Sequence, residues 1–295
     1  MYNKFSGLLT AVVTPFKQDK SVDFDSFEKL IEEQIHHNVD GLVILGTTGE
    51  STTINSREYN QIIKLAIEKS ARKAKIIVGT GGSNVESTIK KTQIARDLGA
   101  DGVLVVTPCY NRPTQKGLHQ YFTKIANEVN IPMLLYNVPA RTGVTLETDT
   151  LANLSRHINI VGIKEASANI LKIVDIINVT DPDFTVLSGD DISCYSTMSL
   201  GAHGIVSVIS NVFIKEMRSL VWQLLHNHFD AAKNSYYKLY PIIKALSGFA
   251  SNPIPIKTLM AYQKKIKEEF RLPLTTMDAK DRQKLIDIYT QYINE

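Results

Sequence analysis

Eight short apolar runs recur along the first 208 residues, and they constrain the fold of this chain more than any other feature. The runs are near-continuous and rich in Val, Ile and Leu, which is typical of strands buried on both faces of a parallel sheet. They are Leu8–Val13, Gly41–Leu45, Ile76–Val78, Gly102–Val106, Met133–Tyr136, Ile160–Ile163, Thr185–Leu187 and Gly204–Val208. Most are separated by roughly the length that a strand–helix unit requires.

The segments between the runs have helical periodicity. Phe24, Phe27 and Ile31 fall on one stripe after a candidate cap at Asp23. Asn55, followed three residues later by a glutamate, has the pattern of a capping box and predicts the start of another helix.

Eight strand–helix units predict a closed (β/α)8 TIM barrel. A doubly wound open sheet is the alternative, but the first run is followed by Val13-Thr-Pro-Phe16 and not by a Gly-x-Gly-x-x-Gly fingerprint. Beyond about residue 225 the runs stop, and helices are predicted over residues 229–246, 256–270 and 279–293. We therefore predict a catalytic barrel over residues 1–225 and a C-terminal helical extension over residues 226–295.

Composition limits the partners and the compartment. The chain has 33 Lys+Arg against 30 Asp+Glu, a net charge of +3, which argues against a nucleic-acid partner. No apolar run approaches the length of a membrane span, so no membrane partner is expected. Two cysteines, Cys109 and Cys194, form no disulfide framework, and we expect a cytoplasmic protein.

Catalytic residues of such barrels lie at the carboxyl ends of the strands. Lys164 directly follows the sixth run, so its amine should point into the barrel mouth. Burial there disfavours the ammonium form, and a neutral amine can form a Schiff base with a carbonyl. Tyr136 ends the neighbouring fifth run and could move protons. The residues alone leave alternatives open: Lys164 could pair with Glu165 at the rim, and Tyr136 could only fill the barrel top.

Other strand ends suggest anion binding. Thr47 and Thr48 lie between glycines, in a turn that could offer hydroxyls and amides to a small anion, or be a simple turn. Arg141 could hold a carboxylate with both of its terminal nitrogens, or form a surface ion pair. Metal chemistry is not expected, because no strand end carries His-x-His and no His-Glu-x-x-His occurs. A phosphate site is disfavoured by Asp190 and Asp191 after the seventh run.

Three motifs together resemble the pyruvate-dependent class I aldolase/lyase family. They are Gly46-Thr-Thr-Gly-Glu50, Tyr136-Asn-Val-Pro-Ala-Arg-Thr-Gly143 and Gly162-Ile-Lys-Glu165, and the resemblance covers essentially the whole chain. It implies a (β/α)8 barrel and a lyase that needs no cofactor beyond a lysine imine. Within the family, it implies the condensation of pyruvate with L-aspartate 4-semialdehyde to 4-hydroxy-tetrahydrodipicolinate, a step of diaminopimelate and lysine biosynthesis.

The resemblance also assigns catalytic roles. Lys164 matches the Schiff-base lysine, and Tyr136 matches the proton-relay tyrosine. Thr47 matches the hydroxyl that links this tyrosine to a second one, matched here by Tyr110. In the family the second tyrosine enters the site of a neighbouring subunit, so the resemblance implies at least a homodimer, and often a homotetramer.

Substrate contacts follow in the same way. Thr48 matches the position that binds the pyruvate carboxylate, and Arg141 the residue that receives the semialdehyde carboxylate. Gly189 and Val206 match positions that line the pocket.

Two other functions share parts of this pattern. N-acetylneuraminate lyase-like relatives share the lysine and the tyrosine, but Thr48 and Arg141 favour the semialdehyde as acceptor. A catalytically silent barrel that acts as a binding protein is disfavoured by the complete set of catalytic residues. Lysine-inhibited members carry polar effector-binding side chains where this chain has Ser56, Tyr59, Ser83, Ser87 and Cys109. Few of these could hold a lysine, so weak or absent feedback inhibition is predicted.

Overall fold

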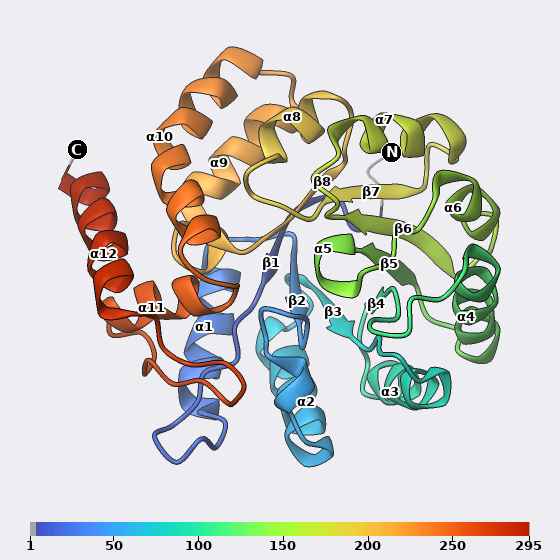
Figure 1. Cartoon of the computed structure of the whole chain (residues 1–295), viewed down its shortest axis with the longest axis horizontal. Coiled ribbons are helices and arrows are strands. Elements are labelled where there is room, and N and C mark those ends of the chain that lie inside the picture. The colour runs from blue at the N-terminus through green and yellow to red at the C-terminus, as the bar shows by residue number, and fades with distance from the viewer. Residues whose placement is uncertain (1–3, 295) are drawn as a thin grey trace.

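The computed structural model describes residues 4–294, and its eight parallel strands close into a barrel (Figure 1). Each strand pairs with the next in sequence, and β1 also pairs with β8. The strands are β1 Gly7–Ala11, β2 Gly41–Ile44, β3 Lys75–Gly79, β4 Gly102–Val106, β5 Met133–Asn137, β6 Ile160–Glu165, β7 Thr185–Ser188 and β8 Gly204–Ser207. The predicted (β/α)8 barrel is therefore confirmed, and the open sheet is excluded.

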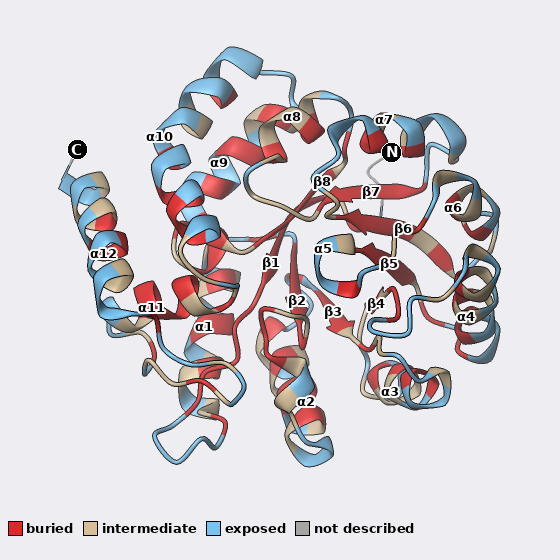
Figure 2. Ribbon diagram, in the orientation of Figure 1, coloured by how far each residue is buried: buried red, intermediate tan, exposed pale blue. Residues whose placement is uncertain are grey.

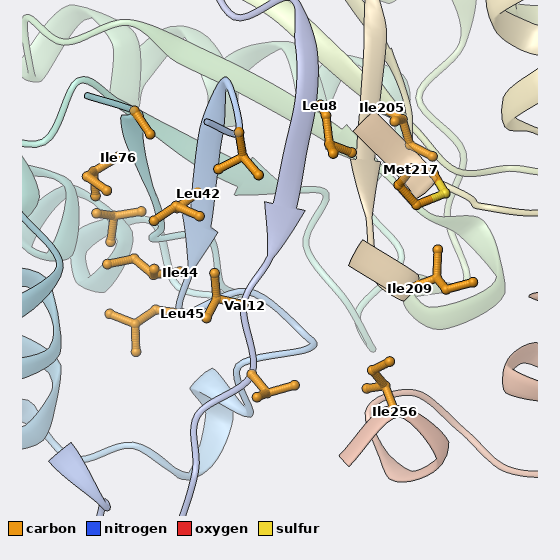
Figure 3. Packing of buried hydrophobic residues seen from close by; sticks show 14 of the residues in the cluster. Leu8, Val12, Leu42, Ile44, Leu45, Ile76, Ile205, Ile209, Met217 and Ile256 are labelled. Carbon is orange, nitrogen blue, oxygen red and sulfur yellow. The ribbon is translucent and has the colours of Figure 1, made fainter. Parts of the chain in front are cut away.

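Both faces of the strands are buried, which explains why the apolar runs do not alternate with polar residues (Figure 2). Side chains that point inward, such as Leu9, Val43 and Leu187, form a cluster inside the barrel. Side chains that point outward, such as Leu8 and Leu42, pack against the surrounding helices (Figure 3).

The helices begin where the sequence places caps. The Asp23 carboxylate accepts from the backbone N–H of Ser26, and Asn55 forms a reciprocal capping box with Glu58. The helices of the barrel are α1 Phe24–His36, α2 Ser56–Ser70, α3 Val85–Asp97, α4 Gln115–Glu128, α5 Pro139–Thr142, α6 Thr148–Leu154, α7 Ile170–Val179, α8 Cys194–Ser199 and α9 Ile214–Leu225. Two short 3-10 turns, η1 Ser51–Thr53 and η2 Ile209–Asn211, follow β2 and β8.

Three more helices follow α9: α10 Phe229–Gly248, α11 Ile254–Tyr262 and α12 Ala279–Asn294. They gather on one side of the barrel (Figure 1), where α10 packs on α8 and α9. α11 contacts η2, and Figure 3 shows Ile256 of α11 near Ile209. The predicted boundary at 225/226 falls between α9 and α10. The division into two domains stays a prediction, and residues 1–3 and 295 lie outside the described residues.

The helix predicted over residues 256–270 is wrong beyond Tyr262, where α11 ends. Lys264 adopts a left-handed φ of 59°, and the backbone turns there. Ile266 and Phe270 are both buried and four residues apart, the spacing of a helical stripe. They nevertheless lie in an irregular segment. Among the described residues, no helix combines the length and the apolar character needed to cross a bilayer.

Candidate active site

A cavity of about 560 Å³ opens at the carboxyl ends of the strands. Its walls come from the loop after β2, from β5 and β6, and from the loop after β7. Residues 246–252, at the end of α10 and in the loop before α11, form a further wall. This is the end of the barrel at which active sites of this fold lie. Thr47, Thr48, Tyr136, Arg141, Lys164 and Gly189 all line the cavity, so six of the eight predicted site residues meet in one place.

Lys164 and Tyr136 are brought together by the sheet register, which pairs them directly across β5 and β6. Their side chains are only 6% and 7% exposed. The Lys164 Nζ lies 4.4 Å from the centroid of the Tyr136 ring, a cation–π contact when the amine is charged.

The predicted alternative, an ion pair between Lys164 and Glu165, does not form. The Glu165 carboxylate instead accepts from Asn137 Nδ2 at 2.8 Å and from the Ser167 backbone N–H at 2.7 Å. Since successive strand residues face opposite sides, Glu165 points away from the cavity. Among the described residues, no carboxylate forms an ion pair with Lys164. Its amine thus lies in the cavity wall with no ion-pair partner in the described part of the chain.

The Gly46–Ser51 loop after β2 is a tight turn. The Ser51 N–H donates to the Gly46 carbonyl at 3.3 Å, and the Glu50 N–H donates to the Thr47 carbonyl at 3.1 Å. This turn presents Thr47 and Thr48 to the cavity.

Asn252 links two of the predicted binding residues. Its amide nitrogen donates to Thr48 Oγ1 at 2.9 Å, and its backbone carbonyl accepts from Arg141 Nη2 at 3.1 Å. Arg141 forms no ion pair among the described residues, so the alternative of a surface ion pair does not hold there. Asn252 was missed in the sequence because its Gly/Ser/Asn/Pro-containing surroundings predict only a loop, and its role depends on a meeting with distant strands.

Gly189 and Val206 differ in position. A Cβ added to Gly189 would lie 2.6 Å from Ala166 Cβ and 3.0 Å from Lys164 Cε, so only glycine fits beside the lysine. Val206 is fully buried in the cluster inside the barrel and does not line the cavity. Val208, which follows β8, lines the cavity, and a pocket-lining role for Val206 stays a prediction.

Tyr110 is not brought to the cavity of its own chain. Its side chain is 96% exposed, on a backbone with a left-handed φ of 73°. Contact between Tyr110 and Thr47 within one chain is therefore absent, and a role in the site of a second subunit stays a prediction.

Asp191 is a further cavity residue whose carboxylate is bound to the backbone. Its Oδ2 accepts from the N–H groups of Val208 at 2.8 Å and Ile209 at 3.1 Å. Burial raises the pKa of this carboxyl. The amides that follow β8 often bind phosphate in such barrels, and here they are already used by Asp191. In the described part of the chain, no three His, Cys, Asp or Glu side chains are grouped to hold a metal ion.

Comparison with known proteins agrees with this geometry. The model of the dihydrodipicolinate synthetase family matches residues 4–292. A 4-hydroxy-tetrahydrodipicolinate synthase of Hydrogenobaculum sp. (strain Y04AAS1) is 42% identical over 97% of this chain and 98% of its own length.

Solved structures agree as well. Dihydrodipicolinate synthase from Aquifex aeolicus superposes with a TM-score of 0.96 at 39% identity, covering 98% of both chains. The chloride-inhibited enzyme from Acinetobacter baumannii, solved with pyruvate, has a TM-score of 0.96 at 38% identity and covers 98% of this chain and 99% of its own. Matches of this length and identity, on a barrel with these side chains at its mouth, show that the chain belongs to the dihydrodipicolinate synthetase family.

Proposed function

We propose that this chain condenses pyruvate with L-aspartate 4-semialdehyde through a Schiff base on Lys164, giving 4-hydroxy-tetrahydrodipicolinate. The observation that carries the proposal is the buried Lys164 amine, which faces the cavity without an ion pair and lies against the Tyr136 ring. The names of the relatives, and the pyruvate bound to one of them, support the same reaction.

The first half of the reaction uses the amine as a nucleophile. Lys164 Nζ adds to the ketone carbon of pyruvate, and loss of one water leaves an imine. The imine nitrogen withdraws electrons, so a proton leaves the methyl group and an enamine forms. Thr48, at the cavity wall, would bind the pyruvate carboxylate through its hydroxyl.

In the second half, the enamine carbon attacks the aldehyde and forms the new carbon–carbon bond, while the aldehyde oxygen takes up a proton and becomes the hydroxyl group. The amino group of the semialdehyde then adds to the imine carbon and displaces Lys164 as a free amine. Arg141 at the cavity mouth would hold the semialdehyde carboxylate.

Proton transfers need a group beside the imine. The Tyr136 phenol is the candidate, because its ring contacts the Lys164 amine and lines the same cavity. We assign Thr47 to orient it and Tyr110 of a second subunit to extend the relay, which makes the functional unit a homodimer or a larger homo-oligomer such as a tetramer.

No resident cofactor or metal enters this scheme, because the imine itself supplies the electron sink. A cytoplasmic location is part of the proposal, supported by Cys109 and Cys194, which are both free thiols.

The test combines two measurements on the wild-type protein. Turnover of pyruvate and L-aspartate 4-semialdehyde is measured by coupled assay, and borohydride reduction in the presence of pyruvate is followed by mass mapping. We expect turnover, and a reduced adduct on Lys164. An adduct without turnover of the semialdehyde, together with cleavage of N-acetylneuraminate, would favour the sialic-acid lyase activity instead. Absence of any adduct would refute the Schiff-base mechanism.

A further inference from the structure

A second lysine of this chain is buried more completely than Lys164. Lys257 in α11 has no exposed surface, and Glu50, its ion-pair partner, is 3% exposed. The Lys257 amine donates to the Glu50 carboxylate and to the Thr14 carbonyl, the latter at 3.1 Å. It also lies over the ring of Phe16, 4.4 Å from its centroid. Burying two charges costs solvation energy, so such a pair is weak evidence for stability alone and points to a positioning role.

Glu50 connects the Gly46–Ser51 loop to the surrounding structure. Its backbone is left-handed with φ 51°, and its N–H donates to the Thr47 carbonyl. Its second carboxylate oxygen accepts from the Arg271 backbone N–H at 3.3 Å. The loop is also held to the segment that follows β1, because Thr14 Oγ1 donates to the Gly49 carbonyl at 2.7 Å. Lys257 thus joins the segment after β1, the loop after β2 and the C-terminal extension at one point.

The same stretch of the extension reaches the loop twice. Asn252, just before α11, donates to Thr48 Oγ1, and Lys257, within α11, binds Glu50 two residues further along the loop. Thr47 and Thr48, which this part of the loop presents to the cavity, therefore lie at or next to the first of these contacts.

We propose that the buried Lys257–Glu50 ion pair is a positioning device that sets Thr47 and Thr48 for the pyruvate half of the reaction. The proposal rests on the proposed function, since it assumes that these threonines face bound pyruvate. Under this proposal, Lys257 and Glu50 affect pyruvate binding although they contact neither substrate. The C-terminal extension then contributes to the pyruvate site.

The test uses the variant Lys257→Met in the full chain. Imine formation is followed as borohydride trapping of pyruvate alone, over a range of pyruvate concentrations. Without its cation, the Glu50 carboxylate must find water or another donor, and the loop shifts. Because a misplacement of about 1 Å can cost about 100-fold in rate, we expect the half-saturating pyruvate concentration to rise about ten-fold or more. The KM for the aldehyde should change much less.

Lys265→Met is the matched control. It removes a lysine of the same extension that pairs with Glu33 of α1 at 2.6 Å and contacts neither the Gly46–Ser51 loop nor the cavity. Its half-saturating pyruvate concentration should stay within about two-fold of the wild type.

A double variant separates positioning from folding. Glu50→Gln combined with Lys257→Met leaves no unpaired buried charge, so it should fold even where Lys257→Met does not. Far-UV circular dichroism and thermal unfolding report its fold. A folded double variant with a raised half-saturating pyruvate concentration supports the proposal. Wild-type pyruvate saturation in that variant, or failure of both variants to fold, would assign the pair to stability and overturn the proposal. Failure of the proposed function is distinct, because wild-type protein would then give no adduct on Lys164.

Discussion

Replacing Gly189 by alanine tests how closely the cavity is built around Lys164. The added Cβ would lie 2.6 Å from Ala166 Cβ and 3.0 Å from Lys164 Cε. Carbon atoms prefer separations of about 3.5–4.0 Å, so one or both neighbours must move by about 0.5–1 Å. Ala166 Cβ is fixed to the backbone, so the backbone around Gly189 must shift to relieve that contact, and Lys164 Cε, at 3.0 Å, must also move, which displaces the amine.

Two magnitudes follow from this displacement. Overpacking of this kind destabilises a protein by about 1–3 kcal/mol, which a barrel of this size tolerates. A shift approaching 1 Å at a reacting atom costs up to about 100-fold in rate. We therefore expect Gly189→Ala to remain folded and to lose about 10- to 100-fold in kcat/KM, with slower borohydride trapping of pyruvate.

The matched control is Gly82→Ala, in the loop after β3 and outside the cavity. A Cβ there would meet only Thr88 Oγ1, at an ordinary distance of 3.8 Å. Both variants are compared by thermal unfolding, coupled assay and trapping. Wild-type kcat/KM in a folded Gly189→Ala variant would refute the argument that the cavity wall leaves Lys164 no room.

Four further outcomes are expected. Lys164→Ala should lose nearly all turnover and all borohydride-trapped adduct, and wild-type turnover would refute the mechanism; Tyr110→Phe should keep a fraction of the activity, and full activity would remove Tyr110 from the relay. Sub-millimolar lysine should inhibit weakly or not at all in a steady-state assay, and strong inhibition would contradict the assignment of the effector positions. Hydrogen bonding to Arg271 lowers the pKa of Glu58 below its usual value, so its contribution to stability is present above about pH 4.3 and lost as pH falls through the lowered pKa. The loss of thermal stability between pH 5 and 3 should be smaller in Glu58→Gln than in wild type, and an equal loss would contradict this.

The barrel could be predicted because its signal is local and repeated. Strands such as Gly102–Val106 are buried on both faces over most of their length, so nearly every residue of the run is apolar. The position of Lys164 near the mouth follows equally well, since residues at the carboxyl ends of the strands in this fold lie there. Cap patterns at Asp23 and Asn55 are also local, and the structure confirms both.

What could not be predicted depends on contacts between segments far apart in sequence. Asn252 meets Thr48 across 204 residues, and Lys257 meets Glu50 across 207. The periodicity of residues 256–270 favoured a long helix, because Ile266 and Phe270 repeat at helical spacing whether or not the backbone continues as one. A strand pattern likewise shows which face of the sheet the Val206 side chain occupies, but not how deep inside the barrel it lies.

The boundary near residue 225 divides the chain by its sequence pattern, but the active site contains residues from both sides of it. The barrel supplies Lys164 and Tyr136, but residues 246–252 form a wall of the cavity. Asn252 orders Thr48 and Arg141, the two residues assigned to the substrate carboxylates. Lys257 neutralises a carboxylate that the barrel alone would leave without its buried partner cation. The C-terminal extension therefore completes a site whose reacting side chains come from the barrel strands. A deletion in the extension should for this reason be tested for pyruvate binding as well as for stability.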